Sequence, residues 1–282
     1  MYRLFAENEK KERVELTNSP FFEVIEIDGL LPQDATISTT TFANTDGSKI
    51  NSARVEQREM TITICPRYPV EENRQKLYKY FRTKKETTLY FKNDNRDVVI
   101  AGVVNKFDGS LFEQTQTITI ELLCEIPYWH DKYSTVGDMA RVEDLFEFPF
   151  AIEEEGIEFS RINREMTQTV RNNGDVETGM IIELYASETV VNPKIYNVQT
   201  KEYFGLKTTM QLGDVIQINT NDLRKRVELT RYGETRNLIN SIEKGNKWLK
   251  LTPGENQFTY TCDSGAEYLH VKFTFSNMYE GV

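Results

Sequence analysis

The stretch that decides the fold is VEQREMTITI, residues 55–64. Apolar side chains stand at every second position from Met60 to Ile64, with threonines between them. A period of two puts the apolar side chains on one face of a β-strand and the polar side chains on the other. Residues 115–124, TQTITIELLC, repeat this alternation. The two stretches therefore predict strands of a sheet that buries one face.

The chain between these two stretches predicts a β-hairpin. Residues 87–91 and 98–104 are rich in β-branched and aromatic residues, which favour strands. The residues that separate them, NDNRD at 93–97, have the polar chemistry of a turn.

A single amphipathic helix is predicted over residues 70–83, directly after Pro69. One stripe at helical spacing is formed by Val70, Arg74, Leu77, Tyr78 and Phe81. Two glutamates occupy the first turn and three basic residues follow the last, an order that complements the helix dipole. The first half of the chain is therefore expected to be a β-barrel or β-sheet domain with one helix packed on it.

Residues 32–54, PQDATISTTTFANTDGSKINSAR, differ from the strands around them. They are rich in Thr, Ser, Asn and Asp, and Asp46-Gly47 is a turn signal. This composition predicts a long loop or a protruding hairpin that cannot bury itself. Long ordered loops are usually functional, whereas simple flexibility is the alternative that composition leaves open.

A domain boundary is predicted near Pro127-Tyr128-Trp129, where the alternation stops, with Trp129 expected at the junction. The boundary gives domains of residues 1–130 and 131–282. Acidic, irregular sequence such as Glu153-Glu154-Glu155-Gly156 follows it. Short strands separated by turn residues are then expected at 179–186, 194–198, 208–212, 214–219, 257–262 and 267–277. Evenly spaced short strands without helices between them predict a β-sandwich.

The composition excludes several classes of protein. With 34 basic and 44 acidic residues, the formal net charge of −10 disfavours binding of DNA or an anionic membrane. The same charge would suit a surface past which DNA slides, or would simply keep the protein soluble. The three cysteines lie far apart in apolar runs and predict no disulfide framework. Neither a signal peptide nor an apolar run long enough to cross a bilayer is expected.

The sequence predicts no catalytic, metal-binding or cofactor-binding residue. His130 and His270 have no other His or Cys at a metal-ligand spacing. The motifs of nucleophile elbows, phosphate-binding loops and dinucleotide folds are missing. Acidic residues are abundant, but nothing marks a pair of them as catalytic. The chain is therefore expected not to be an enzyme.

Trp248 has two interpretations. An exposed tryptophan before the turn Thr252-Pro253-Gly254 would stack on a sugar ring, since β-sandwiches often bind carbohydrate. Alternatively, Trp248 and Leu251 pack under the edge of the sandwich.

The order of these features resembles the distal tail proteins of long, non-contractile-tailed phages. The pieces that carry the resemblance are PFFEVIEIDGL (20–30) with the following polar stretch, the strand 54–65 with Pro66-Arg67-Tyr68 and the helix, Pro127-Tyr128-Trp129, and the C-terminal series NGD (173–175), PKI (193–195) and LTPGEN (251–256). The order of these pieces spans nearly the whole chain.

The resemblance implies a structural baseplate protein of a phage or prophage, without cofactors. Its first domain would form a homo-hexameric ring that joins the tail tube protein to the tail-associated tip protein, with DNA passing through in transit. The second domain would be a galectin-like β-sandwich. The protein would assemble in the bacterial host cytoplasm and reside at the virion tail tip. Residues 32–54 would serve as an arm whose subunit contacts come from Thr39, Thr40, Phe42, Asn44, Asp46 and Gly47. The alternative is a carbohydrate- or receptor-binding protein that acts through the C-terminal sandwich and Trp248.

Overall fold

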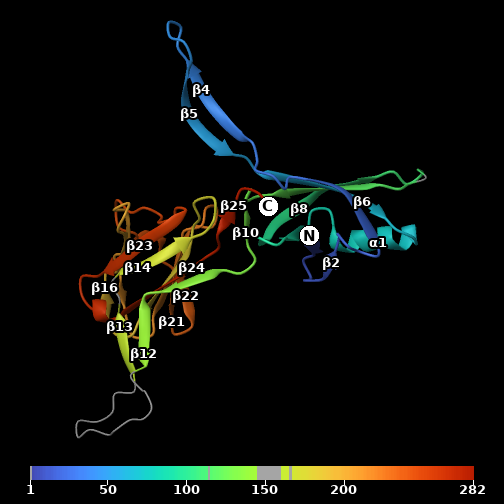
Figure 1. Ribbon diagram of the computed structural model, residues 1–282. Coiled ribbons are helices and arrows are strands. Elements are labelled where there is room, and N and C mark those ends of the chain that lie inside the picture. Colours follow the sequence, from blue (N-terminus) through green and yellow to red (C-terminus); the bar gives the residue numbers. More distant parts are fainter. Residues whose placement is uncertain (1, 114, 145–159, 165–166) are drawn as a thin grey trace. The chain divides into compact units, whose positions relative to one another are not determined.

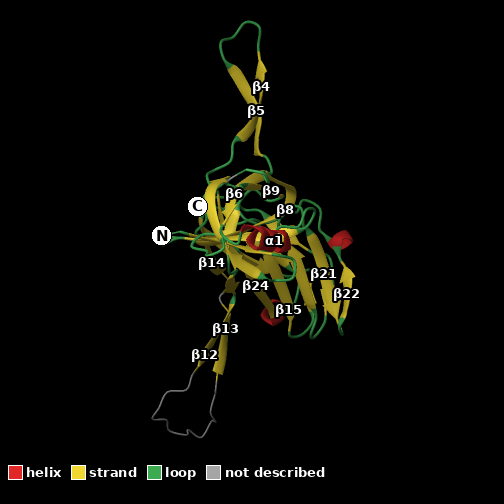
Figure 2. Ribbon diagram, turned by 90° about the vertical axis from the view of Figure 1, so that its right-hand side faces the viewer, coloured by secondary structure: helices red, strands yellow, loops and turns green. Residues whose placement is uncertain are grey.

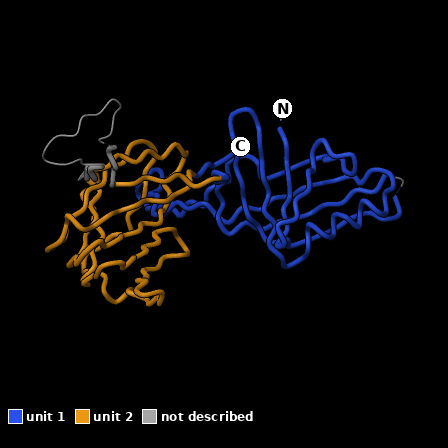
Figure 3. The backbone as a smooth tube through the Cα atoms, turned by 90° about the horizontal axis from the view of Figure 1, so that it is seen from below, with its two compact units in different colours: residues 1–132, 278–282 blue, residues 133–277 orange. Residues whose placement is uncertain are grey.

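The computed structural model describes residues 2–113, 115–144, 160–164 and 167–282. The chain divides into two compact units (Figure 3), of which unit 1 is Met1–Lys132 with Met278–Val282 and unit 2 is Tyr133–Asn277. Strands dominate both units and one α-helix is present among the described residues, which confirms the mainly β prediction. The predicted acidic segment 153–156 lies outside the described residues.

Unit 1 is built on one antiparallel sheet (Figure 1). Its strands, from one edge to the other, are β2 (Arg13–Glu15), β1 (Arg3–Glu7), β7 (Glu86–Lys92), β8 (Asp97–Gly109), β9 (Ile118–Cys124), β6 (Arg58–Pro66) and β3 (Phe22–Asp28). The predicted hairpin is confirmed, since β7 pairs with β8 and the Asn93 amide donates to the Arg96 carbonyl. The predicted alternation is confirmed too, because Met60, Ile62 and Ile64 are buried against the core of this unit.

The predicted strand 55–64 is divided in the structure. Val55 ends one strand and Arg58 begins β6, while Glu56 and Gln57 between them are exposed. Glu56 and Gln57 are both polar, so neither side chain gains by burial in the sheet. The division separates the sheet from the polar segment that precedes it.

Helix α1 (Val70–Tyr80) packs on this sheet and is shorter than the predicted 70–83. Leu77 and Phe81 are buried in the core. Phe81 leaves helical geometry with φ −118° and ψ 75°, and Lys84 has φ +67°. The amide of Lys84 donates to Val104 of β8, so the sheet takes over the backbone hydrogen bonds that would extend the helix. No helix among the described residues is long and apolar enough to span a membrane.

Unit 2 is a β-sandwich, as predicted. Its larger sheet contains β11 (Thr135–Asp138), β24 (Leu269–Phe275), β15 (Ile181–Ala186), β20 (Val215–Asn219), β21 (Arg226–Arg231) and β22 (Glu234–Asn237). The smaller sheet contains β14 (Thr167–Asn172), β23 (Gly254–Thr261), β17 (Lys194–Asn197) and β18 (Tyr203–Gly205). Short elements complete it: β12 (Ala140–Asp144), β13 (Ser160–Arg164), β16 (Val190–Val191), β19 (Thr209–Met210), η1 (Ile239–Ser241) and η2 (Ala266–Tyr268). The ring centroids of Phe258 and Phe273, one from each sheet, lie 5.1 Å apart in the core.

The last residues of the chain return to unit 1. Strand β25 (Met278–Tyr279) pairs with β10 (Trp129–Asp131), which in turn pairs with β8. The sequence-based division assigned everything after residue 130 to the second domain, because local pattern carries no sign of this long-range pairing. Trp129, which was expected at the junction, is fully buried in the core of unit 1.

Candidate assembly interface

The candidate site is an arm, defined here as β4 (Ala35–Thr41), β5 (Ser48–Val55) and the turn between them. It extends away from the sheet of unit 1 (Figures 1 and 2), and its strands pair only with one another among the described residues. Every residue of β4 is exposed, and in β5 only Val55 is half-buried. An isolated two-stranded ribbon is marginally stable in water because nothing covers either face. A surface that packs on the arm would therefore stabilise it.

The strand register gives the arm two different faces. Ile37 is paired with Ala53, and Thr39 with Ile50. Directly paired residues point to the same side of a sheet, so these four side chains form one face, called here the apolar face. Ile37 is 52% exposed and Ile50 is 64% exposed. The opposite face is polar and consists of Thr36, Ser38, Thr40, Lys49, Ser52 and Arg54. The arm is thus amphipathic, and its apolar face is the one that burial would stabilise.

The predicted contact residues are spread over both faces and the tip of the arm. Thr39 lies on the apolar face, while Thr40 lies on the polar face, where its hydroxyl accepts a hydrogen bond from Asn51 Nδ2 at 2.7 Å. Phe42 is 55% exposed directly after β4. The remaining three residues, Asn44, Asp46 and Gly47, occupy the turn. Ile37 and Ile50 were not predicted, because their common face becomes visible only once the register of the hairpin is known.

The base of the arm is held by the sheet of unit 1. The chain leaves β3 through Gly29, which has φ +88° and where an added Cβ would lie 2.5 Å from the Glu59 carbonyl oxygen. Arg58, at the start of β6, is 1% exposed and donates hydrogen bonds to the carbonyls of Gly29 and Leu31. The backbone that leads into the arm is therefore fixed from inside the domain.

Strand β3 forms an open edge of the sheet. It pairs with β6 along one side, and no other described strand pairs with it. Ile25 on this strand is 54% exposed, and Phe21 just before it is 40% exposed. A groove of about 370 Å³ beside the edge is lined by Tyr2, Leu16, Thr17, Asn18, Phe22, Glu23, Val24 and Arg67. An unpaired strand edge can accept a strand from another chain.

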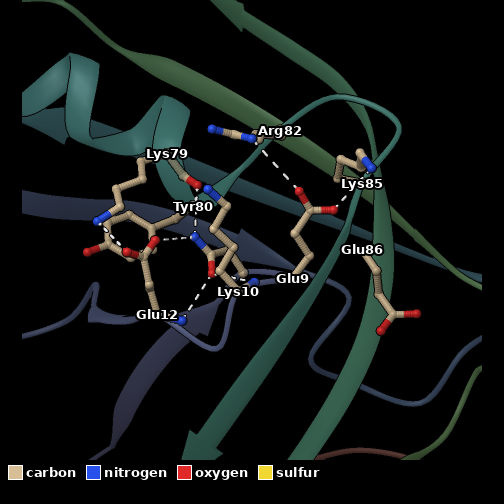
Figure 4. Close-up of a pocket in the computed structure, with 9 residues that line it drawn as sticks. Glu9, Lys10, Glu12, Lys79, Tyr80, Arg82, Lys85 and Glu86 are labelled. Carbon is tan, nitrogen blue, oxygen red and sulfur yellow. Dashed lines mark hydrogen bonds and ion pairs between the residues drawn. The ribbon is translucent and has the colours of Figure 1, made fainter.

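A smaller hollow, of about 70 Å³, is lined mainly by charged residues that pair with one another (Figure 4). Glu9 forms ion pairs with Lys85 at 3.1 Å and Arg82 at 3.8 Å, while Glu12 pairs with Lys79 at 2.8 Å. The hydrogen bond from Lys79 lowers the pKa of Glu12 below its usual value. These contacts tie the turn after β1 to the end of α1. Nowhere in the described parts of the chain do three or more His, Cys, Asp or Glu residues gather as a metal site would require.

Trp248 is half-buried against the core of unit 2. Its ring centroid lies 5.1 Å from that of Phe204, and Lys225 Nζ lies 5.9 Å from the Trp248 ring. This packing accounts for the side chain without a ligand. The two histidines stand on other elements: His130 is on β10 and His270 is half-buried on β24.

Comparison with known proteins assigns the chain to a family. Residues 10–124 match the phage tail protein RIFT-related domain, and residues 173–279 match the C-terminal domain of the siphovirus-type tail component. The chain belongs to the distal tail protein family of siphophages and is a structural component of a phage tail. No curated protein sequence matches it.

Solved structures share the fold at low sequence identity. One is the SPP1 Dit (gp 19.1) protein, described as a paradigm of the hub adsorption apparatus in phages that infect Gram-positive bacteria. It has a TM-score of 0.67 and 12% identity, and the match covers 98% of each chain. A chain of the phage P2 baseplate, in its activated conformation with Ca, gives a TM-score of 0.54 at 11% identity, covering 100% of both chains. The same baseplate in its activated conformation with Sr gives a TM-score of 0.53 at 10% identity, with the same coverage.

Proposed function

We propose that this protein forms a homo-hexameric ring at the virion tail tip. The ring joins the tail tube to the tail-associated tip protein and lets DNA pass through its centre, after assembly in the bacterial host cytoplasm. Membership of the distal tail protein family supports the tail location. The observation that carries ring formation is the arm, whose strands expose nearly every side chain.

Unit 1 offers two different surfaces, as a closed ring of identical subunits requires. In such a ring each subunit presents one surface to a different surface of its neighbour. The arm is the donor surface, because its apolar face gains burial only when another molecule covers it. The open edge of β3 and the groove beside it are the acceptor surface, because the edge leaves backbone groups unpaired and Ile25 exposed. The arm of the neighbouring subunit, or a strand beside that arm, would pair with the backbone of β3 and cover Ile25.

The charge of the chain fits a channel rather than a binding site for DNA. A formal net charge of −10 repels the phosphate backbone, so DNA would pass without being retained. We assign no catalytic role to the protein, since the charged hollow beside α1 is occupied by its own ion pairs. The alternative, carbohydrate or receptor binding through Trp248, has less support because Phe204 and the core already pack against that ring.

Deletion of residues 36–50 tests the proposal. The deleted residues are all exposed, so the variant should keep the circular dichroism spectrum and the unfolding midpoint of the wild type. It should remain monomeric at concentrations at which the wild type assembles, as measured by light scattering after size-exclusion chromatography. A deletion variant that forms rings like the wild type would refute the role of the arm. Glycan binding by the wild type that Trp248→Ala abolishes would favour the alternative function.

A further inference from the structure

We propose that Arg58 and the segment Met278–Val282 form a clasp that positions the base of the arm. The arm would then be presented for assembly only after the chain has passed through unit 2 and folded back onto unit 1. This inference rests on the proposed role of the arm and adds that folding of the C-terminal segment comes before assembly.

Arg58 is the centre of the clasp. Its Nε donates to the Pro127 carbonyl at 2.5 Å, and its Nη2 donates to the Glu280 carbonyl at 2.5 Å. Its Nη1 donates to the Leu31 carbonyl at 2.9 Å and to the Gly29 carbonyl. A guanidinium carries five N–H groups in a rigid planar fork, and four of its possible bonds are made here to backbone carbonyls. One buried side chain thus joins three distant parts of the chain.

The segment Met278–Val282 makes further contacts with the same backbone. The amide of Val282 donates to the Leu30 carbonyl at 3.1 Å. The carbonyls of residues 29, 30 and 31, which lead directly into the arm, therefore all accept hydrogen bonds from the clasp. At Gly281 an added Cβ would lie 2.9 Å from Pro32 Cδ, so the two backbones pack closely.

The rest of the segment is anchored in unit 1. The ring of Tyr279 lies under the Arg96 guanidinium at 4.2 Å, and the Tyr279 hydroxyl donates to Asp131 at 2.9 Å. Arg96 Nη1 also donates to the Gly281 carbonyl at 3.0 Å. These contacts hold the segment independently of the arm. Because residues 278–282 follow unit 2 in the chain, the backbone before the arm lacks part of its hydrogen bonding until unit 2 has been synthesised.

A chain that ends at Asn277 tests the clasp, with Gly281→Val as a second variant that keeps the full length. Glu267→Ala is the control, since this exposed glutamate belongs to unit 2 and lies outside the clasp. Thermolysin, which cleaves before leucine, is applied to the monomers at low concentration, and cleavage of the bond between Gly29 and Leu30 is followed by mass spectrometry.

Both disrupted variants should be cleaved there on the order of 10-fold faster than the wild type. In these variants the backbone before the arm can open for the protease without the cost of breaking the clasp hydrogen bonds. Both should also assemble only at higher concentration, while Glu267→Ala behaves as the wild type. Unchanged cleavage, or assembly equal to the wild type by the chain that ends at Asn277, would overturn the inference. Cleavage is measured on monomers, so it tests the clasp even if the wild type forms no rings. Failure of the wild type to form rings would count against the proposed function alone.

Discussion

The guanidinium of Arg58 donates a 2.5 Å hydrogen bond to the backbone carbonyl of Glu280, 222 positions further along the chain. Arg58 is 1% exposed, and burial lowers the pKa of its guanidinium below the usual value. The buried guanidinium is stabilised by the carbonyl groups that accept its hydrogen bonds. Loss of any of these hydrogen bonds would leave a buried polar group without a partner, which is costly. This link connects the start of β6 to the residue that follows β25.

Arg58→Lys should be destabilising although it conserves the charge. A lysine has three donors on a compact ammonium and cannot satisfy four carbonyls in a planar fork. The free energy of unfolding of unit 1 should fall by about 3 kcal/mol, the loss of one or two hydrogen bonds to a charged group. Arg54→Lys is the control, because Arg54 lies exposed on the arm and should change stability by less than about 0.5 kcal/mol. Urea denaturation of both variants measures the difference, and equal stabilities would contradict the role of the fork.

Ile37→Asp should weaken assembly while leaving the monomer folded. Ile37 lies on the apolar face of the arm at 52% exposure. Loss of its burial against a neighbour would cost about 2 kcal/mol per interface, which raises the assembly concentration by on the order of 10-fold or more. Ser38→Asp places the same charge on the opposite face, where we expect a much smaller effect. Light scattering over a concentration series compares the two, and equal effects would show that the faces are not distinguished.

Gly29→Ala should destabilise unit 1 by about 2 kcal/mol, because the residue has a positive φ and no space for a side chain. Gly47 in the turn of the arm is the matched control, with φ +92° and no atom within 4 Å of an added Cβ. Gly47→Ala carries only the cost of the backbone conformation, about 1 kcal/mol, and that cost falls on the arm. Thermal unfolding compares the loss of stability in the two variants. Equal losses would show that crowding at Gly29 is unimportant.

Asp214 predicts a pH-dependent contribution to the stability of unit 2. Its buried carboxylate accepts hydrogen bonds from Arg231 at 2.8 and 2.5 Å, and the Arg231 guanidinium holds the pKa of Asp214 below its usual value. A lowered folded-state pKa stabilises the fold above the unfolded pKa of about 3.9, and this stabilisation is lost as pH falls through the folded value.

Asp214→Asn should therefore lower the free energy of unfolding by about 2 kcal/mol at neutral pH. The gap between variant and wild type should narrow below a pH of about 4. Denaturant titrations at neutral and acidic pH check this, and a gap that does not depend on pH would exclude the ion pair as its cause.

The sequence predicted those elements whose side chains alternate against a core. Strands β6 and β9 and the sandwich strand β24 follow this rule, because one face of each is buried. Strand β21 (Arg226–Arg231) was not predicted, since charged and polar residues surround its two buried positions, Val227 and Leu229.

Features that depend on which residues pair across strands could not be predicted from the sequence. The polar segment was expected as a loop or hairpin, but its apolar face follows from the pairing of Thr39 with Ile50. The return of Met278–Val282 depends on Arg58 and on β10, which lie far away in the chain. Local pattern contains neither relationship, because the first depends on the register of the hairpin and the second on the assembled sheet of unit 1.

The central claim is ring formation, and native mass spectrometry of the wild-type protein over a concentration series tests it most directly. The account predicts a species of hexamer mass that grows with concentration, and ring-shaped particles in electron micrographs of the same sample. A protein that stays monomeric at every concentration and shows no rings in the micrographs would contradict it.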